Sequence, residues 1–162
     1  MSTSTNNQRI NKILDKLNGD KMQILRIQLG NKNITTIICH MSQNETMKQI
    51  DKINIITDQI EKTQDNLGII ILGDFNINQQ DEKQWKKLNK KFSNKLIKNI
   101  KQNTRTGRQI DDVLISRKLN GIIQSKKIAV GQNNEISDHK PILIQIKITK
   151  RDLKPIKNGS DK

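Results

Sequence analysis

The chain has 162 residues, enough for one domain with a buried core, although only 32% of the residues are hydrophobic and 2% are aromatic. Its formal net charge of +14 favours a polyanionic partner, with nucleic acid ahead of an anionic membrane surface. The alternative is a solvated surface on which Lys is the default polar residue. The single cysteine, Cys39, excludes an internal disulfide, and the chain shows neither an apolar leader nor about 18 consecutive apolar residues, so we expect an intracellular protein without a membrane span.

The first predicted elements are a polar leader and a β-hairpin. Residues 1–20 form the leader, in which apolar residues at helical spacing predict a short helix before Gly19. Alternating apolar and polar residues predict one strand over residues 22–29, and residues 34–39 are expected to form the second strand of a hairpin. A turn at residues 31–33 joins the two strands.

Two helices and a buried strand are expected next. Ser42 and Glu45 form a capping-box pattern, and the apolar residues that follow at helical spacing predict a helix over residues 44–64. The continuous apolar run at residues 68–72 is typical of a strand buried on both faces. Acidic residues at positions 81 and 82 suit the first turn of a second helix.

The rest of the chain is mostly strands. They are expected at residues 95–100, 110–116, 121–130 and 142–148. The order of elements predicts an α+β (α/β layered) fold, in which a mixed, mostly antiparallel β-sheet is covered by helices within one domain over residues 21–149. The basic tail at residues 150–162 is expected to be disordered.

Polar residues gather where these predicted strands end. Asp74 and Asn76 follow the buried strand, at a position where side chains face the crevice in which ligands bind, although the same two residues could form only an Asx turn. His139 stands beside Asp138 at the mouth of the last strand, and imidazole is the usual acid or base near neutral pH. His40 closes an earlier strand, where a simple polar strand end is the plainer interpretation.

Asp111 is a carboxylate inside a predicted strand. Burying it costs several kcal/mol unless it is paired, and a His on a neighbouring strand end is a suitable partner that would also fix the imidazole tautomer. Asp112 should face the other way, toward solvent.

Three segments together resemble the endonuclease/exonuclease/phosphatase superfamily: GDFN at residues 73–76, QIDDVL at residues 109–114 and SDHKPI at residues 137–142. The superfamily includes deoxyribonucleases, abasic-site endonucleases, sphingomyelinases and the endonuclease domains of non-LTR retrotransposons. The phrase TRTGRQIDDVL, residues 104–114, looks most like the retrotransposon and abasic-site branches. The resemblance spans residues 22–148 and implies about half of a four-layer αββα sandwich, the C-terminal half.

The resemblance implies a phosphodiesterase and a role for each matching residue. His139 would contact the scissile phosphate, Asp111 would orient it and Asp74 would activate the attacking water. Asn76 would help to bind the phosphoryl group, and His40 would occupy a position that touches phosphate in the family.

The resemblance also implies a cofactor and a substrate. Asp138 would lie at a site for Mg²⁺ (or Mn²⁺), which acts as a Lewis acid on the phosphoryl oxygens. Arg105 and Arg108 favour nucleic acid as the substrate, with DNA ahead of RNA.

One half of the family pattern has no match. That half supplies an Asn on the first strand and a Glu that is a main metal ligand, and Glu45, Glu82 and Glu135 stand in no matching motif. We therefore expect a truncated domain of roughly one sheet, whose open apolar face is covered by a partner chain or by further sequence of a longer gene, unless the chain is a decayed copy.

Three functions follow from these observations. The first is a divalent-metal-dependent phosphodiesterase that acts on nucleic acid and whose active site is incomplete, because the Glu metal ligand has no match. The second is a non-catalytic nucleic-acid-binding or assembly subunit derived from such an enzyme, favoured by the basic charge and the open sheet face. The third is a related phosphatase or lipid phosphodiesterase.

Overall fold

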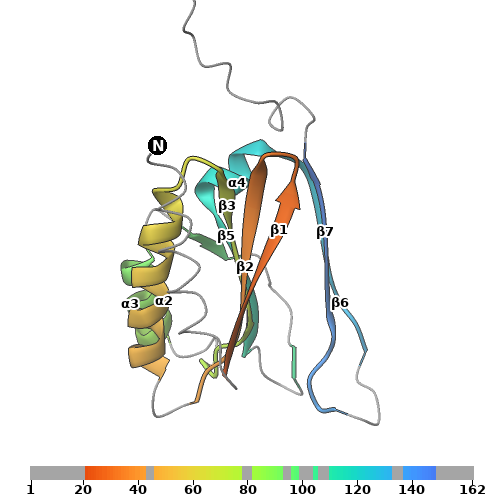
Figure 1. Cartoon of the computed structure of the whole chain (residues 1–162). Helices are drawn as coiled ribbons and strands as arrows, with labels where there is room; N and C mark the ends of the chain where they lie inside the picture. The colour runs from red at the N-terminus through yellow and green to blue at the C-terminus, as the bar shows by residue number, and fades with distance from the viewer. Residues whose placement is uncertain are drawn as a thin grey trace, which may run out of the picture.

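The computed structural model describes residues 21–42, 46–77, 82–92, 96–98, 104–105, 110–132 and 137–148 (Figure 1). The helix expected in residues 1–20 and the tail at residues 150–162 lie outside the described residues. None of the described helices is long and apolar enough to cross a membrane.

The described elements alternate between strands and helices, with strands dominating the second half. In chain order they are β1 (Met22–Leu29), β2 (Lys32–His40), α2 (Thr46–Glu61), β3 (Asn66–Asp74), α3 (Glu82–Lys91), β4 (Leu96–Lys98), β5 (Asp111–Ser116), α4 (Arg117–Ile122), β6 (Ile123–Val130) and β7 (Ile142–Ile148). Every predicted strand and both predicted helices within the described residues are present.

The main sheet has five strands in the order β1-β2-β3-β5-β4. Strands β2 and β3 are parallel, because α2 crosses over between them, and the other three pairs are antiparallel. The predicted mixed, mostly antiparallel sheet covered by helices is therefore confirmed.

Each face of the main sheet carries its own core. Helices α2 and α3 cover one face (Figure 1), with a core built on Ile37, Ile53 and Ile71. The opposite face packs against β6 and β7, and the core there contains Ile70, Val113 and other residues. Neighbouring residues such as Ile70 and Ile71 enter different cores, because side chains alternate along a strand.

The strands β6 and β7 correct the expectation of roughly one sheet. They pair with each other as a separate antiparallel sheet, which covers part of the face that the sequence left open. Two apolar side chains on that face stay about half exposed, Leu25 at 50% and Ile27 at 48%. The face is therefore only partly covered by the described residues.

Two other expectations are wrong in detail. Asp112 is fully buried rather than solvent-facing, because β5 is an interior strand covered on both faces, and its carboxylate accepts a hydrogen bond from the Val113 N–H at 2.7 Å. Residues 117–122 form helix α4, so the strand expected from residue 121 begins at Ile123. The hydroxyl of Ser116 starts this helix by accepting from the Leu119 N–H at 3.3 Å.

Helix α4 is seated on β3 at a glycine. A Cβ atom added at Gly68 would lie 2.3 Å from the Leu119 Cβ and 2.6 Å from the Ser116 Oγ, and the backbone there has a φ of +156°. Because Leu119 and Ser116 are both fully buried, neither can move aside without disturbing the second core.

Replacing this glycine should loosen the contact. We expect Gly68→Ala to lower the free energy of unfolding by about 1–3 kcal/mol, the usual cost of overpacking, in a urea titration. Gly121→Ala is the matched control, since nothing lies within 4 Å of an added Cβ there, and Ala in a helix should be neutral or stabilising by up to about 1 kcal/mol. Equal effects of the two changes would contradict the packing described.

Candidate active site

Three strands bring polar side chains to one end of the main sheet. The register pairs His40 of β2 with Asp74 of β3, and Asp74 with Asp111 of β5. The alternation of each strand places all three side chains on the sheet face that packs against β6 and β7. The row follows from pairing between segments that are far apart in the sequence.

The close approach of β2 and β3 at this end depends on Gly73. Its φ is +138°, and an added Cβ would lie 1.9 Å from the carbonyl oxygen of Cys39. Only glycine fits between these strands, so the residue before Asp74 has no alternative.

The loop after β3 is held on both sides. Asn76 has a φ of 49°, and its N–H donates to Asp74 Oδ1 at 2.7 Å, which is the Asx turn that the sequence allowed. The Asn76 side-chain amide donates to the Met41 carbonyl, and the Phe75 N–H donates to the Ile110 carbonyl at 2.9 Å. Asp74 is thereby fixed in place, and one amide hydrogen of Asn76 is used to hold the loop after β2.

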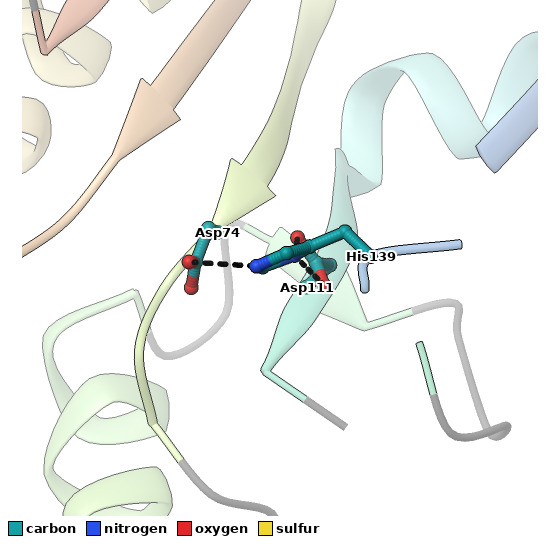
Figure 2. Close-up of side chains that lie close together, drawn as sticks. All are labelled: Asp74, Asp111 and His139. Atoms are coloured by element: carbon teal, nitrogen blue, oxygen red, sulfur yellow. Dashed lines mark hydrogen bonds and ion pairs between the residues drawn. The ribbon is translucent and has the colours of Figure 1, made fainter. Parts of the chain in front are cut away.

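His139 lies against Asp111 (Figure 2). Its Nδ1 is 3.1 Å from Asp111 Oδ1 and 3.0 Å from Oδ2, and because a carboxylate only accepts, Nδ1 carries the shared proton. The other ring nitrogen, Nε2, faces Asp74 Oδ2 at 3.9 Å, which is beyond hydrogen-bond length. The pairing predicted between Asp111 and a strand-end His is present, with Nε2 directed at a second carboxylate.

Thr104 connects the segment of His139 to β5. Its hydroxyl accepts from the Asp111 N–H at 3.1 Å, and its carbonyl accepts from the Lys140 N–H at 2.7 Å. The next residue, Arg105, forms a β-bridge with His139. Motif reasoning missed this role of Thr104, and the only available signal was its position at the start of the phrase that precedes β5.

The environment of Asp74 raises the pKa of its carboxyl group above the ordinary value of 3.8. Burial is the largest cause, and the charge of Asp111 adds to it, whereas the Asn76 N–H and the two imidazoles oppose it. The carboxylate therefore has a stronger affinity for a proton than an ordinary aspartate, which suits a group that takes a proton from water.

The other predicted site residues lie around this centre or outside the described residues. The His40 side chain is 66% exposed, and its Nε2 is 3.8 Å from Asp74 Oδ2. Asp138 forms an ion pair with Arg105, and its Oδ1 is 3.9 Å from His139 Nε2. Arg108 lies outside the described residues.

Asp74, Asp111 and His139 offer ligand atoms that lie within 4.8 Å of one another. Both oxygens of Asp111 already accept from His139, so Asp74 supplies the carboxylate best placed for a cation, with Asp138 nearby. One or two carboxylates completed by water and substrate phosphate are the usual protein ligands of Mg²⁺. The donor set therefore fits a divalent cation, whereas the role of Asp138 as a ligand remains a prediction.

No protein-family model and no curated protein sequence matches the chain. Among solved structures, the chain is similar to the endonuclease domain of TRAS1, a telomere-specific non-LTR retrotransposon, with a TM-score of 0.65 and 13% identity over 83% of this chain. It is also similar to beta toxin 275-280 from Staphylococcus aureus, with a TM-score of 0.51 and 15% identity over 78% of this chain. Humanized D. rerio TDP2 has a TM-score of 0.50 and 10% identity, again over 78% of this chain.

The chain spans 65%, 57% and 60% of these three proteins, which is less than two thirds of each. At these identities the likeness concerns the fold, and two of the three, the TRAS1 endonuclease domain and TDP2, have endonuclease/exonuclease/phosphatase-like folds. The chain therefore has a layered fold of the endonuclease/exonuclease/phosphatase type, as its motifs predicted.

Proposed function

We propose that the chain is a divalent-metal-dependent phosphodiesterase that acts on nucleic acid. One observation carries the proposal: an imidazole held by a buried carboxylate points its free nitrogen at a second carboxylate at one end of the sheet. The fold shared with a retrotransposon endonuclease domain supports the reaction class. The net charge of +14 supports a polyanionic substrate, with DNA ahead of RNA.

The geometry supports different catalytic roles for His139, Asp74 and Asp111. Asp111 holds Nδ1 of His139, so Nε2 can exchange a proton with a phosphoryl or leaving-group oxygen. Asp74, with its raised pKa, takes the proton of the attacking water. Asp111 acts through the imidazole and is a positioning residue.

The remaining residues bind rather than transfer protons. Asp138, beside Asp74, would hold Mg²⁺ or Mn²⁺, which would supply Lewis-acid polarisation of the phosphoryl oxygens when bound. His40 and the second amide hydrogen of Asn76 would bind phosphoryl oxygens. Arg105 would contact the substrate backbone, and the same role is proposed for Arg108.

A second candidate function rests on the half-exposed apolar strip of Leu25 and Ile27. Such a strip beside a core fits a non-catalytic nucleic-acid-binding or assembly subunit, in which a partner chain covers the open part of the sheet face. The strip is also compatible with a split enzyme, in which the partner chain would supply the Glu metal ligand of the family pattern that has no match in this chain.

The phosphodiesterase proposal is tested by cleavage of DNA by the purified protein with Mg²⁺ or Mn²⁺. We expect His139→Ala to reduce the rate by about 10²–10⁴-fold, the usual contribution of general acid–base catalysis. Gln145→Ala, an exposed change on β7, is the control and should cleave like the unchanged protein. If the unchanged protein cleaves nothing in either metal but binds DNA in a salt-sensitive manner, the binding-subunit function replaces the enzyme.

The raised pKa of Asp74 predicts a cost to stability. The folded chain binds the Asp74 proton more tightly than the unfolded chain does, so the free energy of unfolding falls as pH rises from 3.8 through the raised pKa. Asp74→Asn removes this cost. In EDTA, Asp74→Asn should therefore be more stable than the unchanged protein at pH 7, and the difference should shrink toward the acid end of the window.

Urea titrations across that pH range provide the measurement. Asp51→Asn, a change on the exposed side of α2, is the matched control for loss of one carboxylate. A destabilised Asp74→Asn protein at neutral pH would show that the Asp74 carboxylate holds the fold together instead of serving chemistry.

A further inference from the structure

The row of site residues extends one strand further than the motifs indicate. The His40 N–H donates to the Lys21 carbonyl at 2.9 Å, and the adjacent residues Met22 and Cys39 are paired in the ladder. Lys21 therefore lies opposite His40, which lies opposite Asp74, which in turn lies opposite Asp111. Residues from four neighbouring chain segments share one line across the end of the sheet.

The side chains of this row share a face as well. Met22 and Cys39 belong to the core beneath α2 and α3, so the residues next to them point the opposite way, toward the face that bears Asp74. Lys21 is exposed there. Neighbouring strands are about 4.8 Å apart, so Lys21 lies two strand spacings, ~10 Å, from Asp74 along the row.

The far end of the row is also cationic. On the side of Asp111, His139 contacts Asp111, and Arg105 pairs with His139 in a β-bridge. The Arg105 side chain is half-buried against Asp138 at the rim of the site. Cations thus stand on both sides of a centre that is rich in carboxylates.

This arrangement matches a chain of phosphates better than a single one. Successive phosphates of a nucleic-acid strand are separated by one sugar, so ~10 Å on one side of the centre is room for a phosphate that flanks the scissile one. A small phosphoester at Asp74 and His139 would not reach Lys21. A polynucleotide strand can place one phosphate near Lys21 while another phosphate occupies the centre.

We propose that Lys21 binds a backbone phosphate that flanks the scissile one when a polynucleotide strand lies along the row from Lys21 to Arg105. This inference rests on the proposed phosphodiesterase function, and it adds to that site a residue that contacts the substrate away from the reacting phosphate. Lys21 is a specificity residue, since it touches a part of the substrate that does not react.

The first test measures binding without chemistry. The affinity for a short fluorescent DNA duplex is followed in EDTA between roughly 50 and 200 mM salt. Lys21→Gln should lower the slope of log K against log salt by about 0.9 and weaken binding roughly tenfold near 0.1 M salt, the effect of losing one phosphate contact. Lys21→Arg retains the charge and should retain the slope.

Lys87→Gln is the matched control. It removes one exposed lysine charge from α3, on the opposite face of the sheet, and should change the slope much less. If Lys21→Gln and Lys87→Gln lower the slope equally, or if the unchanged protein does not bind the duplex at low salt, the inference is overturned.

The second test compares substrates with Mg²⁺ or Mn²⁺ present. The ratio of kcat/KM for the duplex to kcat/KM for bis(4-nitrophenyl) phosphate should fall several-fold in Lys21→Gln and stay constant in Lys87→Gln. An unchanged ratio in Lys21→Gln overturns the inference. A protein that binds duplex through Lys21 but cleaves neither substrate would refute the proposed function alone, so the two failures are distinguishable.

Discussion

The close contact between β2 and β3 at Gly73 is the constraint on which the site depends. A side chain at residue 73 would meet the Cys39 carbonyl, so the two strands can stay paired up to His40 and Asp74 only because the residue is glycine. The same pairing sets the line that continues to Asp111 on β5 and to Lys21 before β1. A small change in this contact would move every polar group of the row relative to the others.

The second sheet, β6 and β7, contributes to the site because the segment that joins its two strands carries His139. His139 stands between β6 and β7, and the Gly131 N–H donates to the Pro141 carbonyl at 2.8 Å to close the base of that connection. The apolar faces of β6 and β7 pack on the main sheet through the second core. Hydrophobic packing therefore holds the backbone near Asp111, and the polar contacts of Thr104 and Asp111 set the final orientation of the ring.

The electrostatics of the centre are unfavourable for folding. Asp74 and Asp111 face each other across neighbouring strands, where like charges raise the cost of ionisation. Imidazoles on two sides offset part of this cost, and a bound cation would offset more. Groups that a fold holds in unfavourable surroundings are common at functional sites. The half-exposed strip of Leu25 and Ile27 is a second such feature, since it leaves apolar surface beside a core.

Local sequence signals predicted which polar residues gather at the strand ends, and the predicted pairing of Asp111 with a strand-end His is present in the structure. The abrupt end of the apolar run at Gly73 indicated Asp74, a carboxylate inside an apolar strand indicated Asp111, and the SDHKPI segment at the mouth of the last strand indicated His139, because these signals are local. Distances came only from the tertiary structure, since strand register is set by pairing between segments tens of residues apart. Register explains why Lys21 joins the row without any motif. Asp112 is buried because both faces of the sheet are covered. The start of an expected strand is instead helix α4, whose Leu119 packs against Gly68. In both places, tertiary packing overrides local propensity.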